Sequence, residues 1–180
     1  MTEILLCSEK FFKSETNISD NVDGKVITSA MREAQEFKLR GVLGDALLDK
    51  LVELVRNGTI GSPENAKYAA LVKGSQYFLA YSAVTESFFK LNYRIGNFGV
   101  TTTSDENLQP LSYDDLCQVR DDYQHKADAY CRSLQNFLLR HRADYPELTE
   151  NHCASIRANL TATASCGMWL GGARGKKIRR

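Results

Sequence analysis

The sequence predicts an all-α fold, a bundle of four to five helices, and three observations predict it. Apolar residues recur every three or four positions over four long stretches of the 180-residue chain, which is the spacing of one helical face. Capping and turn residues separate these stretches. Hydrophobic residues make up 43% of the chain and charged residues 25%, which excludes a disordered or collagen-like polypeptide.

The first element is expected to be an extended arm or a short strand over residues 1–18, because Ile4-Leu5-Leu6 is followed by polar residues. A helix then begins near Ser19 or Asp20. Its apolar stripe consists of Val22, Val26, Ala30, Ala34 and Phe37. Gly41 and Gly44 interrupt this pattern near its end, and a second helical pattern follows. The two helices are expected to form a helical hairpin.

The second helix is expected to end at Asn57-Gly58, a typical C-terminal signal. A third helix starts with Ser62 as its N-cap and Pro63 at its first position, and it runs to about Tyr93. The middle of this helix, residues 77–84, is apolar nearly all round. Such a helix is buried on most of its sides.

Residues 94–111 break the helical pattern, and their glycines and Val100-Thr101-Thr102-Thr103 predict a short β excursion. Ser112 is expected to cap a fourth long helix with the clearest period in the chain. Its stripe consists of Tyr113, Leu116, Arg120, Tyr123, Ala127, Tyr130, Leu134 and Phe137. A stripe of this kind packs antiparallel on a neighbouring helix.

The helical domain is expected to span residues 19–148, and residues 149–180 are expected to form a short helix and an extended, basic, glycine-rich tail. The net charge is +1, but residues 151–180 carry six basic residues and no acidic one, so the rest of the chain carries −5. The tail either solubilises the chain or binds nucleic acid or an acidic protein surface. Its candidate contact residues are Arg174, Lys176, Lys177, Arg179 and Arg180.

No motif predicts catalysis, a cofactor or a metal, so the chain is not expected to be an enzyme. A phosphate-loop interpretation of residues 172–177 fails, because Lys177 stands where Ser or Thr must bind magnesium. The three histidines match no zinc-ligand spacing. The five cysteines are odd in number, without a C-x-x-C pair, and are expected to be reduced. No apolar run reaches the roughly 18 residues of a membrane span, so no membrane partner is expected.

Four apolar residues in segments of weak local structure are candidates for a subunit interface: Trp169, Leu170, Phe98 and Val100. Leaving a large apolar side chain in water costs about 1.5–3 kcal/mol. Trp169 is therefore expected to bury itself, either on its own core or on a neighbouring subunit. Aromatic anchors beside basic residues are typical of interface hot spots.

The chain resembles the small head–tail connector (adaptor, or head-completion) proteins of tailed phages and prophages of gut Bacteroidales, including crAss-like phages. The resemblance covers about residues 4–175. It is carried by the order and spacing of short runs: Ser8-Glu9-Lys10-Phe11, Asn17-Ile18-Ser19-Asp20-Asn21, Leu43-Gly44-Asp45-Ala46-Leu47, Gln76-Tyr77-Phe78-Leu79-Ala80-Tyr81, Thr103-Ser104-Asp105-Glu106-Asn107, Tyr113-Asp114-Asp115 and Trp169-Leu170-Gly171-Gly172.

This resemblance implies a structural virion protein without catalysis or cofactor. Its subunits assemble, often twelve-fold, into a ring beneath the portal that extends the DNA channel and docks the next tail or connector protein. The expected partners are thus the chain itself, the portal and a tail component, with any DNA contact non-specific. The expected location is the head–tail junction of the virion, after assembly in the bacterial host cytoplasm.

Two alternatives stay open. The first is a tail terminator or tail-completion ring protein, which differs in its position within the particle. The second is a nucleic-acid-binding accessory protein that acts through its basic tail. Binding of duplex DNA through five terminal bases would fall with salt at a log–log slope of about −4.5.

Overall fold

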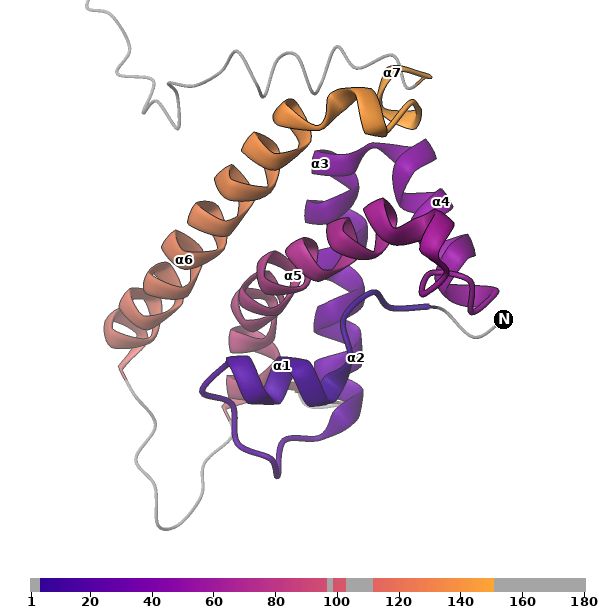
Figure 1. The fold of residues 1–180 in the computed structure, drawn as a ribbon. Coiled ribbons are helices and arrows are strands. Elements are labelled where there is room, and N and C mark those ends of the chain that lie inside the picture. Colours follow the sequence, from indigo (N-terminus) through magenta and orange to yellow (C-terminus); the bar gives the residue numbers. More distant parts are fainter. Residues whose placement is uncertain (1–3, 97–98, 103–111, 151–180) are drawn as a thin grey trace, which may run out of the picture.

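The computed structural model describes residues 4–96, 99–102 and 112–150, and this part of the chain is mostly helical (Figure 1). Among the helices described there, none combines the length and the apolar character needed to cross a membrane. The elements in chain order are α1 (Glu9–Glu15), α2 (Gly24–Glu33), η1 (Ala34–Leu39), α3 (Arg40–Leu43), α4 (Asp45–Arg56), η2 (Pro63–Asn65), α5 (Ala66–Asn92), β1 (Tyr93–Gly96), β2 (Gly99–Thr102), α6 (Tyr113–Arg140), η3 (Arg142–Asp144) and α7 (Glu147–Glu150).

The segment expected to be an extended arm contains the helix α1 instead. Ser8 caps this helix by accepting a hydrogen bond from the backbone N–H of Phe11 at 3.2 Å. Leu6, Cys7 and Phe12 are all buried in the core. The prediction of an arm was wrong because a helix of seven residues is too short to show a periodic pattern.

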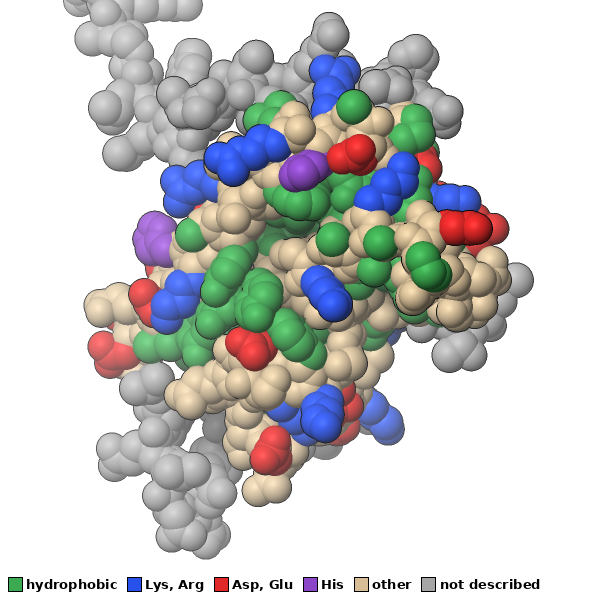
Figure 2. Space-filling view, viewed as in Figure 1, with side chains coloured by type: hydrophobic (Ala, Val, Ile, Leu, Met, Phe, Trp, Pro, Cys, Tyr) green, Lys and Arg blue, Asp and Glu red, His purple; other side chains and the backbone are tan. Residues whose placement is uncertain are grey.

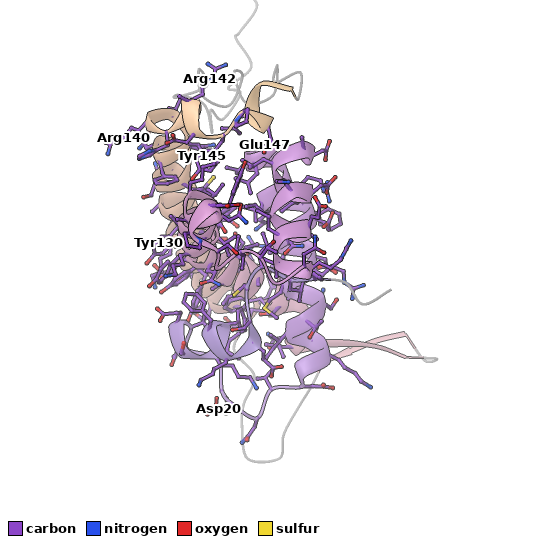
Figure 3. The ribbon with its side chains drawn as sticks, turned by 45° about the vertical axis from the view of Figure 1, so that its right-hand side comes forward. Asp20, Tyr130, Arg140, Arg142, Tyr145 and Glu147 are labelled. Carbon is purple, nitrogen blue, oxygen red and sulfur yellow. The ribbon has the colours of Figure 1, made fainter. Side chains whose placement is uncertain are left out.

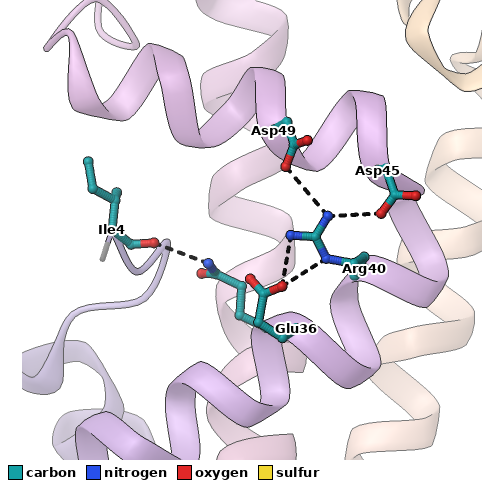
Figure 4. Close-up of polar contacts among 6 residues, drawn as sticks. Ile4, Glu36, Arg40, Asp45 and Asp49 are labelled. Carbon is teal, nitrogen blue, oxygen red and sulfur yellow. Dashed lines mark hydrogen bonds and ion pairs between the residues drawn. The ribbon is translucent and has the colours of Figure 1, made fainter. Parts of the chain in front are cut away.

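A buried glutamine holds the start of the chain in place. The side-chain Oε1 of Gln35 accepts a hydrogen bond from the backbone N–H of Leu6 at 2.9 Å. Its Nε2 donates to the carbonyl of Ile4 at 3.1 Å, the contact drawn at Ile4 in Figure 4. Both backbone groups would otherwise lack a partner in or near the core, at a cost of about 1–3 kcal/mol each. Residues 4–7 are thus an integral part of the body.

The helices α2, η1 and α3 follow one another without a break, and η1 is a π-helix. A π-helix has i→i+5 hydrogen bonds and therefore wider turns. The wider turn keeps Ala34, Leu39 and Leu43 in the core, but it rotates Phe37 out of the stripe, and this side chain is 76% exposed. The prediction that Phe37 belongs to the apolar stripe was wrong because it assumed regular α-helical spacing.

Gly44 forms the corner between α3 and α4, with a φ of 80° that favours glycine. Arg40 spans this corner (Figure 4). Its guanidinium lies 2.8 Å from a carboxylate oxygen of Glu36, 2.8 Å from one of Asp45 and 3.5 Å from one of Asp49. The predicted helical hairpin is present, and the ion pairs of Arg40 link its two arms.

The long helix α5 lies between α2 and η1 on one side and α6 on the other. Lys38 of η1 connects all three layers: its Nζ lies 3.1 Å from a carboxylate oxygen of Glu86 and donates to Thr85 Oγ1 at 3.0 Å and to Gln124 Oε1 at 3.2 Å. After α5, β1 and β2 pair antiparallel from Tyr93↔Thr102 to Gly96↔Gly99, within the segment where a short β excursion was expected.

Ser112 caps α6 as expected, and its Oγ accepts a hydrogen bond from the backbone N–H of Asp115 at 3.2 Å. The expected stripe on α6 is partly confirmed, because Leu116, Ala127 and Leu134 are buried. Tyr113, at the start of the same stripe, is 61% exposed. The stripe is thus buried at Leu116, Ala127 and Leu134 but not along its whole length.

The elements η3 and α7 close one end of the body, and Figure 3 shows Tyr145 and Glu147 at this end. Tyr145 is 1% exposed, and its hydroxyl donates to the carbonyl of Lys67 at 2.9 Å. The hydroxyl of Tyr68 donates to Glu147 Oε1 at 2.7 Å. Burial, together with this hydrogen bond, raises the pKa of Tyr68 to about 12. We call these residues, Tyr68, Tyr145 and Glu147, the closed end.

Candidate interaction surface

Six aromatic side chains from three helices form a continuous row, which we call the aromatic ladder. Its members in spatial order are Phe11, Tyr77, Tyr130, Tyr81, Tyr123 and Phe88. Neighbouring ring centroids are separated by 5.3, 5.5, 5.2, 6.1 and 5.8 Å along this order. These spacings lie within the range in which aromatic pairs attract one another.

Helical geometry explains the ladder. Tyr77 and Tyr81 are four residues apart on α5, and Tyr123 and Tyr130 are seven apart on α6, so each pair shares one helical face. The two helices run antiparallel, so the ring of Tyr130 lies between those of Tyr77 and Tyr81. Phe11 extends the row from α1.

The ladder is open to solvent at its second and third rings. Tyr77 is 38% exposed and Tyr130 is 36% exposed, and their rings stack at an interplanar angle of 16°. Figure 2 shows hydrophobic side chains gathered on this face, over α1, α5 and α6. A contiguous exposed apolar patch marks an interaction site more often than single exposed residues do, and tyrosine is enriched among interface hot spots.

Charged groups lie at both edges of the ladder. The Lys126 ammonium lies 5.1 Å from the centroid of the Tyr123 ring and 2.7 Å from a carboxylate oxygen of Asp122. On the α1 side, the hydroxyl of Tyr81 donates to the carbonyl of Glu15 at 3.3 Å, and burial raises the pKa of Tyr81. Residues 8–23 contain four acidic and two basic residues, and residues 112–128 contain five acidic and two basic ones. The segments that flank the ladder are therefore net acidic.

The described structure does not test the interface residues expected from sequence. Val100 lies in β2, with its Cα paired to that of Ile95. The other candidates lie outside the described residues: Trp169, Leu170, Phe98, Arg174, Lys176, Lys177, Arg179 and Arg180. The ladder tyrosines were missed as a site, because a helical period marks a face without showing how completely a neighbour covers it.

The described residues contain no group of three or more His, Cys, Asp or Glu side chains that is placed to hold a metal ion. Cys7 is the most buried of the cysteines that the structure describes. Its burial raises the pKa of the thiol to about 12, so this cysteine stays protonated at neutral pH and is a poor nucleophile. The ladder, by contrast, offers aromatic faces for stacking and hydroxyl groups for hydrogen bonds.

Comparison with known proteins places this surface within one family. A family model described as a family of unknown function, DUF6712, matches residues 39–158. The matched region begins at the last residue of η1 and includes α5 and α6, which supply every ladder residue except Phe11. No curated protein and no solved structure matches the chain. The chain belongs to the DUF6712 family of unknown function.

Proposed function

We propose that this protein is a structural virion protein, a head–tail connector subunit of a tailed phage or prophage. In this proposal its copies assemble in the bacterial host cytoplasm into a ring beneath the portal, with twelve copies as the expected number. The ring extends the DNA channel and docks the next tail component. The described helices form the body of each subunit.

The observation that carries this proposal is the aromatic ladder. Two of its rings, Tyr77 and Tyr130, are more than a third exposed, although the helices that hold them pack on the core. A rigid, contiguous aromatic patch suits a protein contact better than a catalytic step. A ring needs head-to-tail contacts in which a patch on one subunit meets a different patch on the next. The ladder supports the role of one such patch.

The resemblance to phage connector proteins supports the remaining part of the proposal, which is the place of the ring in the particle. That resemblance includes the run Gln76–Tyr81, which contains two of the ladder tyrosines. A connector also has no need of a catalytic centre, because its task is mechanical. Its contact with DNA should be weak and independent of sequence, since phosphate contacts carry no direct sequence information.

The test is the mass of the purified full-length protein, measured by light scattering with and without the cognate portal. We expect a ring-sized species, either alone or only when portal is present. Electron microscopy of the mixture should then show the ring beneath the portal. A strict 20.2 kDa monomer that ignores the portal would overturn the proposal. A ring that binds the end of the tail tube instead would favour the tail terminator role.

A further inference from the structure

We propose that the aromatic ladder of one copy binds residues 166–172 of the neighbouring copy, with Trp169 as the anchor. This inference rests on the proposed ring, and it names the segment that covers the ladder there. Three properties of the chain favour this occupant: its aromatic content, its charge and its length. Each is independent of the resemblance to connector proteins.

The aromatic content of residues 166–172 matches the ladder. The segment reads Cys-Gly-Met-Trp-Leu-Gly-Gly and contains the single tryptophan of the chain. Tyr77 and Tyr130 are 38% and 36% exposed although they stack on each other, and an indole ring can pack edge-to-face against the ring surface that remains open. The glycines on both sides of Trp169 allow the backbone to approach a surface closely. A large apolar side chain gains about 1.5–3 kcal/mol from such burial.

The charges are complementary. Residues 151–180 carry six basic residues and no acidic one, whereas the two segments that flank the ladder carry an excess of two and three acidic residues. A basic strand that lies across the ladder would therefore place its positive charges near residues such as Glu15 and Asp122. Complementary potentials of this kind steer association and fix the orientation of the bound segment.

The chain is long enough to reach a neighbour. Trp169 lies nineteen positions after Glu150, the last residue of α7, and nineteen residue steps span up to about 65 Å when extended. A compact chain of 180 residues has a radius of gyration of only about 16 Å. The tail can thus leave its own subunit and cross to the next one. In a ring, this tether keeps the segment at a high effective concentration near its site.

In the closed ring, every copy therefore binds one neighbour through its tail and the other neighbour through its aromatic ladder. Such a contact is head-to-tail, as ring closure requires. It also affects assembly more than folding, because the contact lies between subunits. A variant that weakens the contact should lower the stability of the subunit far less than it weakens assembly.

Crosslinking in the full-length protein tests this inference. Ser133 is exposed one turn beyond Tyr130 on α6, so Ser133→Cys places a thiol beside the ladder, and Cys166 supplies the second thiol from the tail. A short bismaleimide is added to the assembled ring, and mass spectrometry of the linked peptides identifies the pair. Matched controls are Ser133→Cys with Cys166→Ser, and Glu53→Cys, which is exposed on α4 away from the ladder.

We expect positions 133 and 166 to be linked in a band with the mass of two chains, and the Glu53→Cys variant to show no link to Cys166. A link between 133 and 166 within a single chain, independent of dilution, would overturn the inference, because the tail would then cover its own ladder. Rings without any such link would overturn it as well but would leave the proposed function intact. Absence of rings, with or without portal, would overturn both this inference and the proposed function.

Fluorescence gives a second readout without added cysteines, because Trp169 is the single tryptophan. Its emission should move to shorter wavelength when subunits assemble and should return to the solvent-exposed position in Tyr130→Asp. Phe37→Asp is the matched control, since Phe37 is exposed outside the ladder and should leave the emission unchanged. Trp169→Ala should weaken each contact about 30-fold, as expected for a hot spot. Emission that stays solvent-exposed in assembled rings would contradict the inference.

Discussion

The closed end and the aromatic ladder both contain tyrosines of α5, but the two sites differ in how far their tyrosines are buried. Each joins α5 to an element that follows it in the chain, and each uses tyrosines. At the closed end the tyrosine hydroxyls bind Lys67 and Glu147, and Tyr145 is 1% exposed. On the ladder, Tyr77 and Tyr130 stack on each other but remain more than a third exposed. Figure 3 shows Tyr130 along α6, away from the end that holds Tyr145.

This difference separates stability from assembly. A buried tyrosine whose hydroxyl is hydrogen-bonded contributes to the free energy of unfolding, because unfolding exposes its ring to water and breaks its hydrogen bond. A stacked tyrosine that is more than a third exposed contributes less to folding and keeps part of its ring surface open for a partner. Substitutions at the two sites should therefore affect different measurements.

The largest effect on stability is expected at the closed end. Tyr145→Ala removes a fully buried ring and should lower the free energy of unfolding by about 3–5 kcal/mol. Denaturant unfolding followed by circular dichroism measures it. Tyr145→Phe keeps the ring and loses only the hydrogen bond to Lys67, so it should cost far less. Equal losses in the two variants would show that packing at this end is loose.

The next largest effect on stability is expected at Tyr68, and it depends on pH. Burial and the bond to Glu147 raise the pKa of Tyr68 to about 12, from an ordinary value of about 10, so the folded state holds this proton more tightly. The resulting stabilisation is complete below pH 10 and is lost between pH 10 and pH 12. Tyr68→Phe should cost about 1.5–3 kcal/mol at pH 7. It should also lose less stability than the wild type between pH 10 and pH 12, and a parallel decline would contradict this.

A smaller effect on stability is expected on the ladder. Tyr130→Ala removes two stacked pairs from a half-exposed position and should lower the free energy of unfolding by about 1 kcal/mol. The same variant should lose ring assembly, which light scattering measures. If its unfolding free energy fell as far as that of Tyr145→Ala, the ladder would be part of the subunit core and the comparison would fail.

The smallest effect is expected at Phe37. This side chain is 76% exposed, so Phe37→Ser should change the free energy of unfolding by no more than about 0.5 kcal/mol. Because Phe37 lies on η1, outside the ladder, the variant should also assemble normally. Loss of assembly in Phe37→Ser, measured beside Tyr130→Ala, would move the subunit contact from the ladder to η1.

The long helices were predictable from sequence because each has a full periodic pattern and a clear end, such as Gly44 or the Ser112 cap. The short helix α1 was not, since seven residues show no period. Phe37 was misplaced because a π-turn leaves no signature in the spacing of apolar residues. The ladder needed the structure, because the sequence around Tyr77 is apolar on all sides and does not show that this face stays partly uncovered.

The most direct test of the central claim compares two single variants, Tyr130→Asp and Phe37→Asp. Each is mixed with the cognate portal, and light scattering measures the mass of the resulting species. The account predicts that Phe37→Asp forms the same portal-bound ring as the wild type. It predicts that Tyr130→Asp stays a 20.2 kDa monomer with a melting temperature close to that of the wild type. A ring of unchanged mass and affinity in Tyr130→Asp would contradict the claim that the aromatic ladder is a contact between subunits.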